Sequence, residues 1–260
     1  MEIFGFIGAL IIGLILGLTG GGGSILTVPI LVYILLVNPV TATAYSLFIV
    51  GTTAVFGATQ NYFKGLVDIK TGFIFAIPSF TAVFITRRFL VPLIPNTVIE
   101  KPIIIEKSSF LMALFAIIML FAAFSMLKKK KEIVTTDLKS SLFSLIIQNF
   151  IIGIIIGLVG AGGGFLIIPS LVLFAKLPMK KAVGTSLFII AMNSLIGFMG
   201  DVQNLTIDWL FLIKFTSLSI IGIFIGIYLN RFINESQLKK GFGYFVLLMA
   251  CFILLKEFYM

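Results

Sequence analysis

The chain has no histidine among its 260 residues and a single cysteine, Cys251. These two absences exclude whole classes of chemistry. Internal disulfides, zinc clusters, haem ligation by histidine and Ser-His-Asp catalysis each need residues that the chain lacks. A serine hydrolase of another kind would still need a general base, and the sequence offers no obvious one. We therefore expect no enzyme, no cofactor and no bound metal.

Charged residues are also scarce, at 11% of the chain, whereas 60% is hydrophobic and the mean hydropathy is +1.20. Many apolar runs approach about 20 residues, the length of helix that crosses a hydrocarbon core of about 30 Å. The sequence therefore predicts an all-α polytopic membrane protein in a lipid bilayer. We attribute the net charge of +9 to lipid headgroups and membrane orientation, not to nucleic acid, because the basic residues lie in loops and at helix ends.

The hydrophobic runs, divided by glycine, proline and charge, predict five helical elements in each half of the chain. The expected elements are 3–19, 23–37, 41–59, 69–91 and 107–127, then 141–159, 163–175, 181–199, 206–230 and 238–257. A basic stretch at 128–140 is expected to be a cytoplasmic linker. It separates a first transmembrane repeat, 1–127, from a second transmembrane repeat, 141–260.

The two halves are copies of one unit. Residues 13–50 align with 153–190 without a gap, and 16 of these 38 pairs are identical. The same offset of 140 positions places Gly57 on Gly197 and Asp68 on Asp208. Chance similarity between apolar segments would match leucine and isoleucine, not glycine and aspartate. A repeated unit that contains an interrupted membrane helix is typical of the binding site of a transporter.

The charge distribution bears on the orientation of the two repeats. An odd number of crossings per repeat would invert the second copy relative to the first. In each repeat a glycine cluster links the first two elements (3–19 to 23–37, and 141–159 to 163–175). If both linked elements cross the membrane, or both enter it and return to the same side, one side collects 13 of the 19 Lys and Arg residues and is cytoplasmic. If they form one broken span, the split is 10 to 9 and carries no information. We favour inverted repeats in the cell inner membrane with both termini outside, which places the loop 87–107 outside too.

A glycine cluster interrupts the first helical region of each repeat. We name these clusters the first glycine break (residues 20–24) and the second glycine break (residues 160–164). In a bilayer every backbone N–H and C=O needs a partner, so bare glycine backbone must face protein, water or a ligand. A new helix follows each break, and its first N–H groups carry the positive end of the helix dipole. The two breaks together predict a central anion site near the membrane midplane. The alternative is close helix packing on glycine, which is favoured for the single Gly13/Gly17 and Gly153/Gly157 pairs.

The third element of each repeat adds polar side chains at membrane depth, and several recur at equivalent positions. Such groups usually bond to their own backbone or to a neighbouring helix, so a structural role stays open beside contact with a substrate. The predicted substrate-binding residues are Gly20, Gly21, Gly22, Gly23, Ser24, Gly160, Ala161, Gly162, Gly163, Gly164, Ser46, Ser186, Thr52, Thr53, Asn193 and Ser194.

No charged residue lies in the middle of a predicted span, so the sequence shows no carboxylate relay of the kind that marks proton pumps. Asp68 and Asp208 are the best candidates for ion coupling, but both lie at helix starts, where a capping role is favoured. Several polar residues beyond the third elements could line a vestibule or belong to ordinary loops: Gln60, Asn61, Asp201, Gln203 and Asn204.

At these motifs the chain resembles the sulfite exporter TauE/SafE family. The shared pattern is a duplicated Gly-x-x-x-Gly-x-x-Gly-x-Gly-Gly followed by proline, here at 13–29 and 153–169, and it continues at 182–187. Two positions depart from that pattern, Tyr45 and Ser24, and could alter the choice of substrate. The resemblance implies a secondary transporter that moves small sulfur-containing anions, such as sulfite or organosulfonates, usually outward.

Two other functions stay open at this point. One is a transporter of a different small anion. The other is a non-transporting membrane subunit whose glycines pack helices against a partner protein. A homo-oligomer is compatible with all of these functions.

Overall fold

The computed structural model describes residues 2–99, 105–127, 142–230, 232 and 235–259, so the linker predicted at 128–140 lies outside the described residues. The first repeat comprises α1 (Glu2–Thr19), α2 (Ser24–Pro29), the π-helix η1 (Ile30–Ile34), α3 (Pro39–Phe63), α4 (Ile69–Ile85), the π-helix η2 (Thr86–Leu90), α5 (Val91–Leu93) and α6 (Lys107–Leu127). The second repeat comprises α7 (Leu142–Val159), α8 (Gly164–Leu173), α9 (Met179–Asp201), α10 (Trp209–Leu229) and α11 (Glu235–Tyr259). Between α5 and α6, the short strands β1 (Thr97–Ile99) and β2 (Ile105–Glu106) pair antiparallel.

Five of the described helices are long and apolar enough to cross a membrane: Pro39–Phe63, Ile69–Leu93, Lys107–Phe124, Met179–Asp201 and Trp209–Leu229. Shorter apolar helices cover Phe4–Thr19, Ser24–Ile34 and Phe143–Val159. Large apolar side chains remain exposed on the outer helices, as lipid contact requires. Examples are Phe121 at 72% and Leu248 at 70% of their surface. The chain is thus a multi-pass all-α membrane protein, and this prediction is confirmed.

The first glycine break turns the chain back on itself. A Cβ atom at Gly8 of α1 would lie 2.9 Å from the Ile30 side chain of η1, and one at Gly23 would overlap the backbone of α1 at Ile12 and Leu16. Helices α2 and η1 are 6 and 5 residues long and return alongside α1 as a hairpin. At about 1.5 Å per residue they are too short to cross a bilayer. A single broken span through α1 and α2 is therefore excluded.

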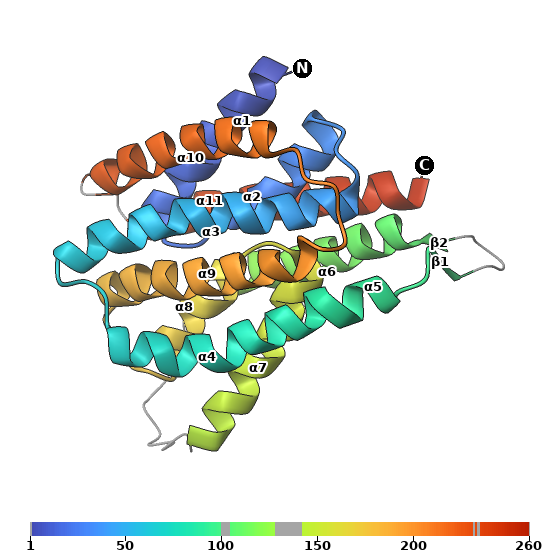
Figure 1. Ribbon diagram of the computed structural model, residues 1–260. Coiled ribbons are helices and arrows are strands. Elements are labelled where there is room, and N and C mark those ends of the chain that lie inside the picture. Colours follow the sequence, from blue (N-terminus) through green and yellow to red (C-terminus); the bar gives the residue numbers. More distant parts are fainter. Residues whose placement is uncertain (1, 100–104, 128–141, 231, 233–234, 260) are drawn as a thin grey trace.

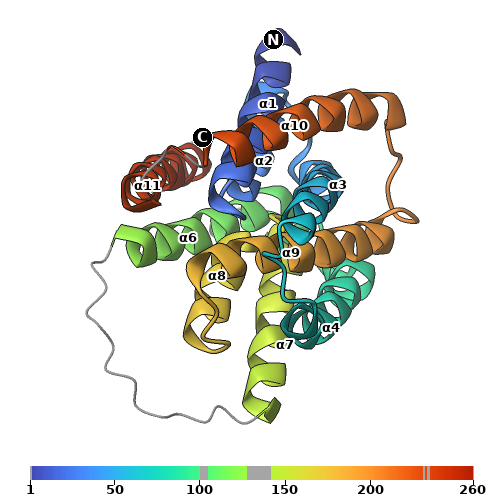
Figure 2. The same ribbon diagram turned by 90° about the vertical axis from the view of Figure 1, so that its left-hand side faces the viewer.

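The first helix of each repeat packs against a helix of the other repeat. Helix α1 packs along α10, and the equivalent α7 packs along α4, while α3 and α9 lie together between them. Figure 2 shows α1 and α7 at opposite ends of the molecule, with α3 and α9 in the middle and α6 and α11 to one side. The repeats are consequently interleaved and do not form separate globular units.

The third helices of the two repeats, α3 and α9, run in opposite directions. The amide of Asp68, just after α3, donates a hydrogen bond to Thr185 Oγ1 near the start of α9 (2.9 Å). The amide of Asp208, just after α9, donates to Tyr45 Oη near the start of α3 (2.8 Å). The end of each helix therefore meets the beginning of the other, and α3 and α9 are antiparallel (Figure 1).

Glycine allows the swapped helices to approach closely. A Cβ atom at Gly13 of α1 would collide with the backbone of Ser219 in α10, and one at Gly153 of α7 would collide with the backbone of Ser79 in α4. These two contacts are equivalent under the offset of 140 positions. The packing role expected for the Gly13/Gly17 and Gly153/Gly157 pairs is confirmed, since small residues permit backbone contact between membrane helices.

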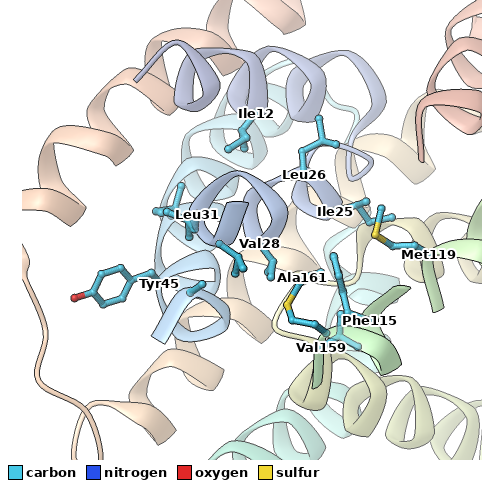
Figure 3. Close-up of a cluster of buried hydrophobic side chains, with 14 of the residues drawn as sticks. Ile12, Ile25, Leu26, Val28, Leu31, Tyr45, Phe115, Met119, Val159 and Ala161 are labelled. Carbon is cyan, nitrogen blue, oxygen red and sulfur yellow. The ribbon is translucent and has the colours of Figure 1, made fainter. Parts of the chain in front are cut away.

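The core surrounds the first break. Every residue of α2 is buried. Figure 3 shows Ile25, Leu26 and Val28 of α2 packed beside Phe115 and Met119 of α6, with the second break close by. Helix α2 is thus held inside the protein, where its backbone does not meet lipid.

We predict that Gly13→Ala destabilises the protein by about 1–3 kcal/mol, because the added methyl group forces the α1 and α10 backbones apart. Gly241→Ala is the matched control. A Cβ atom there meets nothing within 4 Å, and alanine favours the helix. Thermal unfolding in detergent, followed by circular dichroism, measures both variants. Equal melting temperatures would contradict the packing account.

Candidate functional site: the meeting point of the two glycine breaks

The two glycine breaks touch through their backbones. A Cβ atom at Gly21 of the first break would lie 2.6 Å from Cα of Gly164 in the second break. Residues far apart in the sequence thus meet where the two hairpins turn. The backbone at both turns is left-handed, with φ of +74° at Gly20 and +72° at Gly160, a conformation that favours glycine.

Hydrogen bonds to neighbouring side chains satisfy some of the backbone polar groups of the first break. The Gly22 amide donates to Thr19 Oγ1 (2.8 Å), and Ser24 Oγ donates to the Gly21 carbonyl (2.7 Å). Among the described residues, no acceptor faces the amides of Gly21, Gly23 or Ser24. Ser24 therefore serves the turn through its hydroxyl, while its own amide stays free.

Among the described residues, the second break leaves as many amides free as the first, and the amide of the next residue, Phe165, is free as well. The Gly160 amide donates to the Ile156 carbonyl (2.8 Å) and the Gly163 amide donates to the Ala161 carbonyl (2.7 Å). Within the described part of the chain, the amides of Ala161, Gly162, Gly164 and Phe165 have no acceptor. A buried amide without a partner is costly in a membrane protein, so water or a ligand is expected to pair with these groups.

Two of the third-helix residues predicted to bind substrate, Thr53 and Asn193, make hydrogen bonds to the other repeat. Thr53 Oγ1 donates to Ser219 Oγ (3.0 Å), and Asn193 Nδ2 donates to Ser79 Oγ (2.8 Å). The two pairs are equivalent under the offset of 140 positions. They join α3 to α10 and α9 to α4, so these side chains have a structural role. The carbonyl oxygen of Asn193 remains buried without a partner.

The three serines of the third helices at predicted site positions differ in the hydrogen bonds that their hydroxyls make. Ser186 Oγ donates to the Gly20 carbonyl of the first break (2.7 Å) and lies 2.8 Å from the Val183 carbonyl. The hydroxyls of Ser46 and Ser194 are buried and unpartnered among the described residues. Ser194 Oγ lies 3.1 Å from where a Cβ atom of Gly162 would stand. Thr52 is half-buried, and its hydroxyl makes no hydrogen bond within the described residues.

Asp68 and Asp208 cap helices. Their Oδ1 atoms accept hydrogen bonds from the amides of Thr71 (2.9 Å) and Phe211 (3.0 Å). The departure at Tyr45 also has a structural explanation. Its hydroxyl accepts the Asp208 amide hydrogen bond, as the Thr185 hydroxyl does for Asp68 in the other repeat.

Two charged residues near the ends of spans, Arg87 and Asp201, form a buried pair that the sequence does not predict. From the sequence, Arg87 is expected at the start of an outside loop and Asp201 among loop or vestibule residues. Both lie inside helices instead, with side chains 1% and 6% exposed, and Arg87 Nη1 lies 3.3 Å from Asp201 Oδ2. The predicted element 69–91 already contained Arg87, and this was the signal in the sequence. Of the other vestibule candidates, Asn61 is buried and bonded to the Gly57 carbonyl, while Gln203 and Asn204 are exposed.

A cavity of about 460 Å³ lies between α6, α7 and α8. Its lining is mostly apolar, with Gln148 and Ser170 as polar members. The equivalent positions of the first repeat, Gly8 and Ile30, are packed against each other. The hairpin of the second repeat is therefore open where that of the first repeat is closed.

A duplicated all-α membrane unit whose broken helices meet inside the protein is typical of secondary transporters. The chain belongs to the sulfite exporter TauE/SafE family, whose profile matches residues 5–253, and it is a membrane transporter by that membership.

The curated relatives agree with this class. A protein of Xylella fastidiosa (strain 9a5c), named "Probable membrane transporter protein", is 27% identical over 249 residues, which cover 94% of this chain and 91% of the relative. YunE of Bacillus subtilis (strain 168), with the same description, is 26% identical over 95% of this chain and 96% of its own length. MJ0441 of Methanocaldococcus jannaschii is 37% identical over 42% of this chain and 43% of its own length. No solved structure matches the chain.

We predict that Ser186→Ala lowers the free energy of unfolding by about 1–3 kcal/mol, because it leaves the buried Gly20 carbonyl without its donor. Ser194→Ala removes a hydroxyl that has no partner among the described residues, so its melting temperature should match that of the wild type. Thermal unfolding of the two purified variants measures the difference. Equal losses in both would show that the Ser186 hydrogen bond does not hold the first break.

We predict that Asp68→Asn and Asp208→Asn keep both stability and transport, because asparagine caps a helix as well as aspartate does. The corresponding alanine variants should lose about 0.5–2 kcal/mol of stability. Melting temperatures and flux in proteoliposomes provide the two readouts. Loss of flux in a stable Asn variant would indicate ion coupling at that carboxylate.

Proposed function

We propose that this protein is a secondary transporter, and specifically an exporter, of small sulfur-containing anions such as sulfite or organosulfonates. The observation that carries this proposal is the contact between the two glycine breaks, where several amides lack an acceptor within the described residues. Helix α8 begins at the second break, and the positive end of a helix dipole favours an anion. In this proposal the site is centred on the breaks themselves and on the unpartnered hydroxyls of Ser46 and Ser194.

Alternating access follows from the unequal state of the two repeats. The hairpin of α7 and α8 borders a cavity, while the hairpin of α1 and α2 is closed. The equivalent helices α3 and α9 run antiparallel, as inverted repeats require. In this proposal the repeats exchange their open and closed states around the breaks, so that the anion site faces the two sides of the membrane in turn.

The antiparallel arrangement also bears on membrane orientation. A hairpin at each glycine break corresponds to the arrangement in which 13 of the 19 basic residues lie on one side. We assign that side to the cytoplasm and place both termini outside the inner membrane. The family's name supports sulfite as a substrate, whereas the relatives' names specify transport alone.

The proposal predicts binding of sulfur oxyanions by the purified protein. Sulfite, sulfate, thiosulfate, taurine, sulfoacetate and chloride are compared by thermal shift in detergent. A ligand at 100 times its Kd stabilises the folded protein by about 2.7 kcal/mol. Sulfite or a sulfonate should raise the melting temperature of the wild-type protein. Efflux of the same anion from proteoliposomes should be lost in the variant Gly163→Val, because valine is strained at the φ of +74° found at this position.

Asp68→Asn, which keeps its helix cap, serves as the transport control. Binding of another anion, but of no sulfur compound, would identify a transporter of a different substrate. Absence of any anion binding, together with loss of a copurifying protein in Gly163→Val, would identify a non-transporting subunit.

A further inference from the structure

The two glycine breaks have different chemical surroundings despite their shared sequence. Beside Gly20 of the first break lies Val183 of α9, whereas beside Gly160 of the second break lies Thr43 of α3. These neighbours are equivalent under the offset of 140 positions. The second break has an additional neighbour, because Nη2 of Arg87 contacts Gly160. The residue equivalent to Arg87 in the other repeat is Ile227, which is buried and apolar. Within the part of the chain that the structure describes, a charged side chain thus contacts the second break and none contacts the first.

Arg87 is held by one nitrogen and leaves the others free. Its Nη1 donates to Thr43 Oγ1 (3.0 Å) and lies 3.3 Å from Asp201 Oδ2, which accepts no hydrogen bond. The Nε and Nη2 atoms are buried and have no partner among the described residues. These two atoms form one edge of the planar guanidinium, and such an edge donates two parallel hydrogen bonds to two oxygens of an oxyanion.

The position of Arg87 in its helix is unusual. It lies in the π-helix η2, one residue after Thr86, which packs on Gly157 of α7. A π-helical turn inside an α-helix often occurs at a functional site, because the changed helix period redirects the following side chains. Here the side chain contacts the second break, where Gly160 has no Cβ atom to exclude it.

Other free polar groups gather at the same break. Ser46 is three residues after Thr43 on α3 and therefore lies on the same face of that helix. Its hydroxyl is unpartnered, whereas the equivalent Ser186 hydroxyl is bonded to Gly20 of the first break. The unpartnered Ser194 hydroxyl lies beside Gly162. The serine hydroxyl at the first break, that of Ser186, is therefore already bonded, whereas the equivalent hydroxyl of Ser46 is available to a ligand.

We propose that Arg87 is the charged ligand of the transported anion and that the anion binds at the second glycine break. The Nε–Nη2 edge takes two oxygens of a small oxyanion in which both oxygens belong to one centre, such as sulfite or a sulfonate. Thr43 and Asp201 hold the guanidinium from its other side, and the free amides and serine hydroxyls of the second break complete the site. This inference rests on the proposed anion transport and specifies where, and through which residue, the anion is held.

The test removes the charged pair without leaving a lone buried charge, because a single buried ion that has lost its partner strongly destabilises a protein. In the double variant Arg87→Ile/Asp201→Asn, each residue is replaced by the residue type found at the equivalent position of the other repeat. These equivalent residues are Ile227 for Arg87 and Asn61 for Asp201. Arg88→Ile removes the same charge from the neighbouring residue and is the matched control. Isothermal titration calorimetry with sulfite, methanesulfonate and chloride measures binding to the purified proteins.

We expect the double variant to bind sulfite or methanesulfonate at least about tenfold more weakly than the wild type, as the loss of hydrogen bonds to a charged group implies. Arg88→Ile should bind these anions as the wild type does. Arg87→Lys keeps the charge beside Asp201 but lacks the two-armed edge. It should lose affinity for both oxyanions while its response to chloride is unchanged. Should the double variant not fold, Arg87→Lys decides the question.

Wild-type affinity for the oxyanions in the folded double variant, or in Arg87→Lys, overturns the role of Arg87 and leaves the proposed transport function intact. A wild-type protein that binds none of the three anions overturns the proposed function and this inference together.

Discussion

The backbone contact between Gly21 and Gly164 is the constraint on which the rest of this fold depends. Unpaired amides cannot face lipid without a cost of several kcal/mol, so two interrupted helices must be surrounded by protein. The interleaved arrangement meets this requirement. Each repeat's first helix packs on the other repeat, and α3 and α9 lie between them, so both breaks are enclosed. Close packing on glycine at Gly13 and Gly153 allows the enclosing helices to approach near enough to exclude lipid.

The same polar contacts recur in both repeats and keep the breaks in register. Thr53 pairs with Ser219 as Asn193 pairs with Ser79, although the residue types differ. Tyr45 supplies to Asp208 the hydroxyl that Thr185 supplies to Asp68. The duplication is therefore maintained as a set of hydrogen bonds and helix crossings, and individual residues can change as long as a group with the same hydrogen-bonding capacity reaches the same place.

The proposed anion site also requires the surroundings of the two breaks to differ. A site built from backbone amides alone would present similar chemistry at each break, and nothing would favour one over the other. Arg87 and the unbonded Ser46 occur at the second break, while Val183 and Ile227 make the equivalent surroundings of the first break apolar. The open hairpin also belongs to the second repeat. Charge and free space thus occur beside the same break, although Arg87 itself comes from the first repeat, and this is the arrangement that the proposed anion site requires.

The sequence by itself determined the duplicated unit, the helical elements to within a few residues, and the caps at Asp68 and Asp208, because hydropathy, glycine and helix-start signals are local. It also indicated that the two breaks matter, since a cluster of four glycines within four or five residues of a membrane helix needs an explanation. Only the tertiary structure decided that each first helix crosses to the other repeat, that Thr53 and Asn193 bind neighbouring helices, and that Arg87 is buried beside Gly160. Those facts depend on which distant residues meet. A residue's own neighbours in the sequence do not encode whether a charge near a helix end reaches water or turns inward.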